Sequence, residues 1–292
     1  MIWLFDQASG TFDMAVKLMS VVVDQAFMEN LSGRTAVVTG GGSGIGRAIC
    51  FALSAEGMQV VVADREARRA ERVAAEIEAT GHKAIAVTCD VADQTSVDAL
   101  AAQAYEELGP VSLLCNNAGI LQMGPVADAS LDDWHWLFSV NLFGVVHGCR
   151  AFVPRMRAQA EPAHIVNTSS LSGIFAVPAL GVYTAAKYAV VALSETLRVE
   201  EAHNGIGVSV LCPGPTPSRI GETARIDRNM PPQFTEGDAD LTYLGMREPA
   251  QVAACLVEAV KANRLYAFSH APGRIAAEKR FNATLEDFSF AP

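Results

Sequence analysis

Short apolar runs alternate with amphipathic segments along most of the chain. Four runs in the first half are rich in Val, Ile, Leu and Ala and have the length of buried strands, namely residues 36–38, 59–63, 84–88 and 111–115. The segments between them have helical spacing and end at Gly57 or Gly81, or begin after Asp93 as N-cap, giving helices over 47–56, 67–79 and from about 95. This alternation predicts right-handed β-α-β units and a parallel sheet.

The second half continues the pattern with longer helices. A helical region covers 132–157, and Pro154 within it is expected to kink or end the helix. A fifth strand begins at His164 and leaves the sheet at Ser169 and Ser170, and a helix opens near Tyr183. The later elements are a strand over 207–212, a helix over 249–262, a strand over 265–268 and a tail helix over 274–288. We therefore predict one doubly wound α/β domain, with seven parallel strands and helices on both faces.

Three stretches lie outside the regular pattern. Residues 1–33 form an N-terminal extension of unknown role before a domain over 34–292, and they lack the basic segment and clear cleavage site of a signal peptide. Residues 215–248 are irregular and rich in Pro, Gly, Asp and Met, which favours a mobile lid over the substrate; a surface insertion is the alternative. In the tail, Phe281, Leu285 and Phe288 share a helical face that would cover the pocket or a subunit partner.

Composition excludes several classes of protein. Half of the residues are hydrophobic, so a large core is expected, and the net charge of −10 argues against a nucleic-acid or anionic-membrane partner. No apolar run looks long enough to cross a bilayer. The six cysteines lie far apart and most are in apolar runs, as in reduced core residues of a cytoplasmic protein, and the six histidines lack metal-ligand spacing. No metal site is therefore expected.

A glycine-rich turn follows the first strand. Gly40, Gly44 and Gly46 lie where the strand stops and a helix restarts at Ile45. Glycines let the main chain turn and let a phosphate approach the N–H groups of a helix N-terminus. An ordinary strand-to-helix turn is the alternative, but strand, turn, helix and an acid at the end of the second strand occur together, which favours a dinucleotide. No Lys-Ser or Lys-Thr follows Gly46, so the turn is not a P-loop.

Asp64 is that acid, and it bears on the choice of cofactor. It lies 18 positions after Gly46, where a carboxylate accepts hydrogen bonds from an adenosine ribose and repels a 2′-phosphate. A solvated acid at a strand end is the alternative. Arg65 would hold a 2′-phosphate, but no basic residue inside the glycine turn assists it. The sequence therefore favours NAD over NADP.

Several motifs together resemble the short-chain dehydrogenase/reductase superfamily, over about residues 31–268. They are Thr39-Gly-x-x-x-Gly-x-Gly46, Asn116-Asn117-Ala118-Gly119, Asn141 in Val-Asn-Leu-Phe-Gly, and Ser170 thirteen positions before the Tyr183-x-x-x-Lys187 pair. The resemblance implies a Rossmann fold, a nicotinamide cofactor, hydride transfer to or from an alcohol or ketone, and dimers or tetramers. Two other readings are a non-catalytic protein that senses the nucleotide and, less well matched in glycine spacing, a sugar-nucleotide epimerase or dehydratase.

The resemblance also assigns residues to the site. The implied catalytic residues are Asn141, Ser170, Tyr183 and Lys187. The implied cofactor-binding residues are Gly40, Ser43, Gly44, Ile45, Gly46, Asp64, Arg65, Asp90, Val91, Asn117, Ala118, Gly119, Tyr183, Lys187, Pro213, Gly214, Thr216 and Ser218. The Asp90–Val91 pair would border the adenine. A Thr that binds the carboxamide usually follows the Pro-Gly, and because this chain reads Pro-Thr-Pro-Ser, either Thr216 or Ser218 takes that role.

The residue types suit the chemistry. A phenol removes a hydroxyl proton near neutral pH only if its pKa falls from about 10 toward 7, which is roughly 4 kcal/mol. Lys187 lies four residues after Tyr183 on one helical face, and an ammonium ~4 Å away contributes on the order of 4 kcal/mol at an effective dielectric near 20. Ser170 would donate a hydrogen bond to the oxygen that becomes negative. Asn141 lies in an apolar helix and needs polar partners; the alternatives are a local bend satisfied by its own backbone and, from the resemblance, a water held in a proton relay.

The substrate is predicted only by class. Five apolar residues are expected to line the substrate pocket and to suit a hydrophobic secondary alcohol or ketone: Leu121, Ile174, Phe175, Val177 and Leu180. Segments 152–156, 164–166, 169–171 and 265–266 are similar to bacterial dehydrogenases that oxidise benzylic alcohols of lignin-type aryl ethers. An aromatic substrate is the narrower expectation.

Overall fold

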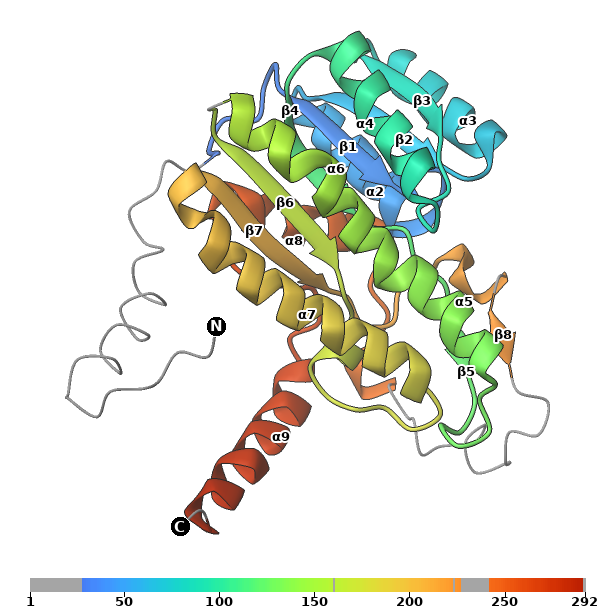
Figure 1. The fold of residues 1–292 in the computed structure, drawn as a ribbon, viewed down its shortest axis with the longest axis vertical. Helices are drawn as coiled ribbons and strands as arrows, with labels where there is room; N and C mark the ends of the chain where they lie inside the picture. The colour runs from blue at the N-terminus through green and yellow to red at the C-terminus, as the bar shows by residue number, and fades with distance from the viewer. Residues whose placement is uncertain (1–27, 160, 223, 227–241, 291–292) are drawn as a thin grey trace.

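The structure is a computed structural model that describes residues 28–159, 161–222, 224–226 and 242–290 (Figure 1). Met28 and Leu31 are buried in the core, so the described end of the predicted N-terminal extension packs with the domain. The apolar stretch 14–23 lies outside the described residues, as do residues 223 and 227–241 of the predicted lid.

A parallel sheet forms the centre of the molecule (Figure 1). In the described part of the chain it has seven strands in the order β3-β2-β1-β4-β6-β7-β9. Their bounds are β1 Thr35–Thr39, β2 Gln59–Asp64, β3 Ala84–Thr88, β4 Val111–Asn116, β6 Ala163–Thr168, β7 Ile206–Cys212 and β9 Tyr266–Phe268. Every pairing within it is parallel. The predicted fold class is therefore confirmed.

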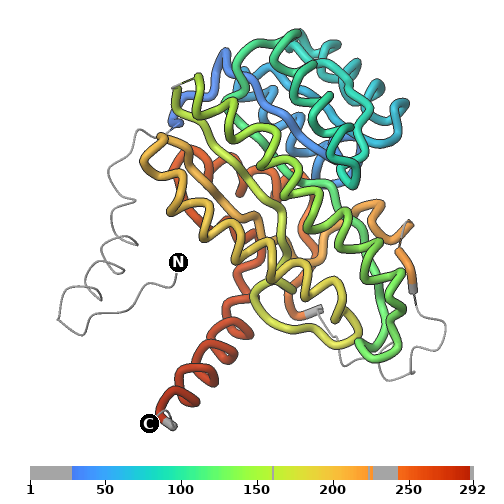
Figure 2. The backbone as a smooth tube through the Cα atoms, in the orientation of Figure 1, coloured from blue at the N-terminus to red at the C-terminus, as the bar shows by residue number. Residues whose placement is uncertain are grey.

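Helices cover both faces of this sheet (Figures 1 and 2). On one face lie α2 (Gly44–Ala55), α3 (Ala67–Glu78) and α8 (Pro249–Lys261). The other face carries α4 (Gln94–Leu108), α6 (Phe143–Gln159) and α7 (Gly181–Glu201). Successive side chains of each strand point to opposite faces, so Val38 packs with the first layer and Val37 with the second. Burial on both faces explains why the strands are continuously apolar.

The long helical region over 132–157 is two helices. Helix α5 (Leu131–Asn141) ends before Leu142, and α6 starts at Phe143 and continues through Pro154 to Gln159. The expectation that Pro154 ends the helix is wrong. Proline removes one helical hydrogen bond, but Phe152 and Met156 on either side of it are fully buried against the sheet and α4. That packing holds the helical turn around Pro154.

The same two helices correct the expectation about membrane-spanning length. By length and hydropathy alone, Leu131–Gln159 is long and apolar enough to cross a bilayer. It is, however, interrupted at Leu142, and both of its parts pack within the domain, α5 against α7 and α6 against α4 and β4. A buried core helix passes the same test, and this packing accounts for its composition.

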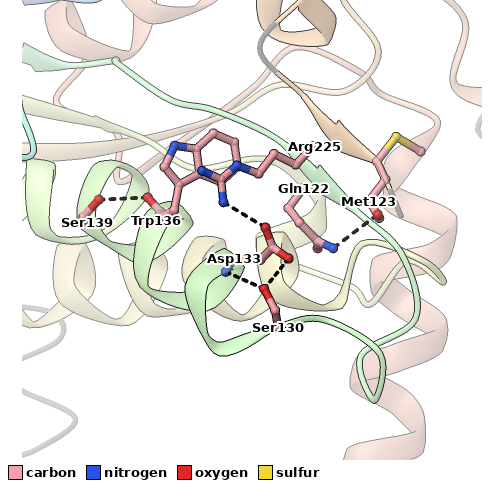
Figure 3. Close-up of polar contacts among 7 residues, drawn as sticks. All are labelled: Gln122, Met123, Ser130, Asp133, Trp136, Ser139 and Arg225. Atoms are coloured by element: carbon pink, nitrogen blue, oxygen red, sulfur yellow. Dashed lines mark hydrogen bonds and ion pairs between the residues drawn. The ribbon is translucent and has the colours of Figure 1, made fainter. Parts of the chain in front are cut away.

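A second, smaller sheet was not predicted. Strand β5 (Gln122–Met123) pairs in parallel with β8 (Arg225–Ile226), which belongs to the predicted lid. Figure 3 shows how Arg225 reaches helix α5: its Nη1 donates to Asp133 Oδ1 at 3.0 Å, and its guanidinium lies 4.0 Å from the ring centroid of Trp136. Residue Arg225 therefore attaches this part of the predicted lid to α5. Short 3-10 helices occur at Leu171–Gly173, Ala202–Asn204, Arg219–Glu222, Thr242–Leu244 and Phe288–Phe290.

The tail helix α9 (Gly273–Asp287) projects from the body of the domain (Figures 1 and 2). Its first turns pack through Ala276 and Ala277 on a cluster that includes Leu171 and Val210. Further along, Phe281, Leu285 and Phe288 are exposed, and none of them is among the residues that line the described cleft. They do not cover that cleft within one chain, whereas a subunit partner stays a prediction.

Candidate active site

A cleft opens where the strands of the central sheet end. The glycine turn after β1, the ends of β2 and β4, and the start of α7 all contribute to it. The sequence-predicted residues that line it are Gly40, Ser43, Gly44, Ile45, Gly46, Asp64, Arg65, Asp90, Val91, Asn117, Ala118, Gly119, Tyr183, Lys187, Pro213 and Ser218. The carboxyl edge of a doubly wound sheet is where ligands of this fold class bind.

The glycine turn is shaped so that side chains other than hydrogen would not fit. Gly40 and Gly44 have φ values of +64° and +50°, a region that favours glycine. A Cβ on Gly46 would overlap the carbonyl oxygen of Gly40 and lie 2.5 Å from Asn117 Nδ2. Helix α2 begins immediately at Gly44, and its N-cap Ser43 makes no side-chain capping bond. The first N–H groups of α2 are thus presented to the cleft, as an anion requires.

The Asn-Asn-Ala-Gly segment joins the neighbouring strand ends. Asn117 Nδ2 donates to Thr39 O at 3.0 Å, and Thr39 Oγ1 accepts the N–H groups of Asn117 and Ala118 at 3.0 and 3.1 Å. Asn116 Nδ2 donates to Asn167 Oδ1 at 2.9 Å, across β4 and β6. These side chains replace backbone pairing where the strands separate to form the cleft.

Asp64 is held in place by backbone groups. Its Oδ2 accepts the N–H of Gly42 at 3.1 Å, and its Oδ1 accepts the N–H of Glu66 at 3.0 Å. The residue is 8% exposed and lines the cleft. Asp64 is therefore not a solvated strand-end acid, because its carboxylate is buried and fixed by two donors.

Tyr183 and Lys187 extend from the first two turns of α7 toward the cleft. Lys187 is buried, and its Nζ donates to Thr168 O at 2.8 Å and lies 5.6 Å from the centroid of the Tyr183 ring. Ser170 lies across from them as the N-cap of a 3-10 turn: its Oγ accepts the N–H of Ser172 at 3.1 Å and donates to Pro213 O at 3.4 Å. Ser169 Oγ donates to Lys187 O, which leaves Ser170 as the serine near Tyr183.

Burial controls the protonation of this pair in the protein alone. It raises the pKa of Tyr183 to about 12, while the hydrogen bond with the Ser170 side chain acts in the opposite direction. Burial also lowers the pKa of Lys187 to about 8. The expectation that Lys187 lowers the pKa of Tyr183 toward 7 is not met here. Desolvation disfavours both charged forms, and the Lys187 ammonium is directed at the Thr168 carbonyl.

Asn141 is fully buried at the end of α5, and its partners lie across the fold. Its Oδ1 accepts the N–H of Ile120 at 2.8 Å, and its Nδ2 donates to the carbonyl of Ile120 at 2.9 Å. A local bend satisfied by its own backbone is therefore excluded as the explanation of its side chain. Asn141 does not line the cleft described here, but Ile120 does.

Three further predicted residues, Ser170, Gly214 and Thr216, are not among those lining the cleft. Thr216 Oγ1 donates to Gly214 O at 3.1 Å, which occupies its hydroxyl, whereas Ser218 faces the cleft beside Gly44. Of the two candidates for the carboxamide contact, only Ser218 lines the cleft, at its glycine turn.

None of the five apolar residues expected around the substrate lines this cleft either. Ile174, Phe175, Val177 and Leu180 pack in a cluster with Leu244.

The cleft fits a nicotinamide dinucleotide. The glycine turn leaves room for a pyrophosphate, and a fixed carboxylate stands at its far end. Thr168 Oγ1 is buried in the cleft wall and has no hydrogen-bond partner among the described residues. A bound polar ligand would satisfy it.

Comparison with known proteins decides the family. The model of the family described as short chain dehydrogenase matches residues 34–229. The chain belongs to the short-chain dehydrogenase family. The 1-deoxy-11-beta-hydroxypentalenate dehydrogenase of Streptomyces exfoliatus is 36% identical over 269 residues, covering 90% of this chain and 92% of the relative. The C alpha-dehydrogenase of a Sphingobium species is 34% identical and covers 91% of this chain and 89% of its own.

A solved structure has the same arrangement. A short-chain dehydrogenase/reductase from Burkholderia phymatum, in complex with NAD, is 36% identical and superimposes with a TM-score of 0.80 over 89% of this chain and 97% of the other. The predicted resemblance, the nicotinamide cofactor and the enzyme class are confirmed. This short-chain dehydrogenase is a nicotinamide-dependent oxidoreductase that acts on CH–OH groups or the corresponding ketones.

Sequence reasoning missed part of the cleft of this short-chain dehydrogenase. The missed lining residues are Glu66, Arg69, Cys89, Ile120, Val140, Thr168, Ser169, Arg219 and Ile220. Glu66 is the N-cap of α3 and Arg69 lies in its first turn, so their position just after the strand end at Asp64 was a usable signal. Arg219 and Ile220 come from the irregular segment after β7, whose sequence has no periodicity to place it.

Proposed function

We propose that the protein is an NAD-dependent dehydrogenase of hydrophobic secondary alcohols, and that aromatic alcohols are its substrate class. The observation that carries the proposal is one cleft with the fixed carboxylate of Asp64 at one end and the Tyr183–Lys187 pair at the other. The first would accept hydrogen bonds from the hydroxyls of an adenosine ribose and repel a 2′-phosphate, and the second suits proton transfer from an alcohol oxygen.

In this proposal the cofactor lies along the predicted residues. The turn at Gly40, Gly44 and Gly46 would hold the pyrophosphate at the N-terminus of α2, Asp90 and Val91 would border the adenine, and Lys187 would reach the nicotinamide ribose. The bound nicotinamide supplies the hydride acceptor for oxidation, or the donor for reduction.

The side chains of the chain itself handle the proton. Tyr183 would take the proton of the alcohol, and Ser170 would donate a hydrogen bond to the oxygen on which negative charge develops. Lys187 lies 5.6 Å from the Tyr183 ring, and a full charge at that distance would stabilise a phenolate by about 3 kcal/mol at an effective dielectric of about 20. Asn141 would act through Ile120, by fixing the backbone that follows Gly119.

The aromatic substrate class has support from one relative. That relative is named C alpha-dehydrogenase, in keeping with the sequence segments that are similar to dehydrogenases of benzylic alcohols. We further propose a small-molecule substrate, a cytoplasmic location and a homodimer or homotetramer. All six cysteines are free, and exposed apolar side chains such as Phe143 and Phe281 are available to a second subunit.

The test is turnover with a panel of aryl and alkyl secondary alcohols and NAD, followed by the absorbance of the reduced nicotinamide. We expect aryl alcohols to give the higher kcat/KM. Tyr183→Phe should bind NAD as tightly as the parent and lose at least about 100-fold in kcat. NAD binding without turnover of any alcohol would contradict the proposal and favour a sensor of the nucleotide. Undiminished turnover in Tyr183→Phe would contradict the role of Tyr183 in proton transfer.

A further inference from the structure

The adenosine end of the cleft contains a charged pair that the sequence did not single out. Glu66 is the N-cap of α3, but its side chain makes no capping bond, and glutamate is not among the residues that cap helices well. Its Oε2 instead pairs with Arg69 Nε at 2.9 Å. Both residues line the cleft, and their side chains are 43% and 22% exposed. The pair faces the ligand site, and it does not serve as a helix cap.

The pair lies directly beside Asp64. A Cβ placed on Gly42 would be 2.6 Å from Arg69 Cβ and 2.7 Å from Asp64 Oδ2, so the arginine and the carboxylate flank the same glycine. The N–H of Glu66 also donates to Asp64 Oδ1 at 3.0 Å. Arg69 is therefore a cation beside the position where an adenosine ribose would meet Asp64, and Glu66 engages it.

A 2′-phosphate at this point would meet opposed charges. Asp64 would repel it, the N-terminus of α3 would attract it, and a free guanidinium would bind it with two parallel hydrogen bonds. While the carboxylate of Glu66 holds Arg69, the guanidinium is neutralised, and a second negative charge stands next to Asp64. Arg65 at the same end is exposed and lines the cleft, so it is the competing candidate for a phosphate contact.

We propose that Glu66 is a second acidic determinant of the preference for NAD, because it withholds Arg69 from a 2′-phosphate. The inference rests on the proposed function, since it specifies how the same cleft chooses between two nicotinamide cofactors. It assigns to the start of α3 a role in specificity that is separate from the ribose contact of Asp64.

The experiment measures binding by calorimetry with two probes that differ only by the 2′-phosphate, 5′-AMP and 2′,5′-ADP. Glu66→Gln should tighten binding of 2′,5′-ADP relative to 5′-AMP by about tenfold, because one charge-assisted contact becomes available. Glu71→Gln is the matched control, since it removes the same charge from the same helix at an exposed position outside the cleft lining. Glu71→Gln should leave the ratio of the two nucleotide affinities within about twofold of the parent's ratio.

The double variant Glu66→Gln, Arg69→Gln identifies the cation. We expect it to lose the gain of the single variant, while Arg65→Gln combined with Glu66→Gln keeps it. The inference would be overturned if Glu66→Gln gave no gain in relative affinity for the 2′-phosphorylated nucleotide, or if Glu71→Gln gave an equal gain. It would also be overturned if the gain were the same with and without Arg69. The ratio of kcat/KM for NADP over NAD should rise in parallel.

The outcome is separable from that of the proposed function. If the parent binds NAD and oxidises alcohols but Glu66→Gln leaves the nucleotide ratio unchanged, only the inference fails. If the parent binds neither 5′-AMP nor NAD, the proposed function fails and the inference with it.

Discussion

Asn141 and Ile120 are joined by two hydrogen bonds, one to each backbone group of Ile120. The Asn141 side chain thereby takes the place of a neighbouring strand for Ile120. Ile120 follows the Asn-Asn-Ala-Gly segment, just beyond the end of β4. The pairing attaches the C-terminal end of α5 to the wall of the cleft, and Asn141 is fully buried. The geometry of the cleft at Ile120 thus depends on a residue outside it.

Asn141→Leu should destabilise the protein by roughly 2–4 kcal/mol, because both backbone groups of Ile120 lose their buried partner. The free energy of unfolding from urea titration measures this. Asn141→Asp retains an acceptor for the Ile120 N–H and should keep part of the activity. A loss below about 0.5 kcal/mol in Asn141→Leu would mean that water replaces the amide.

Gly46→Ala should abolish nucleotide binding or folding, since its Cβ would overlap the carbonyl oxygen of Gly40 and neither backbone segment can yield. Gly221→Ala is the control: a Cβ there meets nothing within 4 Å, and its φ lies outside the left-handed region. NADH fluorescence and circular dichroism of both variants check the difference. If Gly46→Ala still bound NADH with the parental Kd, the turn would have to rearrange to make room for the Cβ.

Lys187 should make stability depend on pH in a defined direction. Its pKa in the folded protein is lowered to about 8 from an ordinary 10.5, so the unfolded chain binds more protons between those values. The free energy of unfolding should therefore rise with pH across this interval, by about 3 kcal/mol from this group.

Lys187→Met isolates that contribution. The stability of the parent relative to this variant should increase from about pH 8 to about pH 10. Urea titrations of both proteins at several pH values measure the difference. A difference that stays constant with pH would mean that Lys187 is charged in the folded protein throughout the interval.

Arg225→Ala should release strand β8, which belongs to the predicted lid, from α5. The variant loses the ion pair with Asp133 and the contact with the Trp136 ring (Figure 3), together about 1 kcal/mol because both lie near the surface. Arg225→Lys keeps the charge but not the planar group over the indole. We expect Trp fluorescence to change in both variants. The KM for the alcohol should rise more in Arg225→Ala than in Arg225→Lys. Unchanged KM in Arg225→Ala would mean that the segment does not contribute to substrate binding.

Much of the fold could be predicted because buried parallel strands are continuously apolar. The runs around Val37, Val61 and Leu114 had no other plausible place than the centre of a sheet. The small sheet of β5 and β8 could not be predicted, because two-residue strands have no periodicity and their pairing depends on contacts such as Arg225 with Asp133. The break at Leu142 was also missed. Pro154 is the obvious helix breaker in the sequence, but the buried side chains around it decide the outcome.

For the site, spacing along the chain located the polar residues better than the apolar ones. Gly46, Asp64, Tyr183 and Lys187 belong to motifs whose geometry is local, and they meet in one cleft. Phe175, expected around the substrate, packs in an apolar cluster and does not line this cleft, and an apolar residue gives the same signal in a core as in a pocket. The pKa of Tyr183 also could not be judged from residue spacing, since burial is the largest influence on it and raises it.

The order of strands in the sheet has a consequence for synthesis. Growth from β1 proceeds first through β2 and β3 on one side and then through β4, β6, β7 and β9 on the other. Because chains emerge from the ribosome N-terminus first, the glycine turn and Asp64 would be assembled well before Tyr183 and Lys187 are translated. A nascent polypeptide of this design could bind the adenosine portion of a dinucleotide before it had any means of turning over an alcohol.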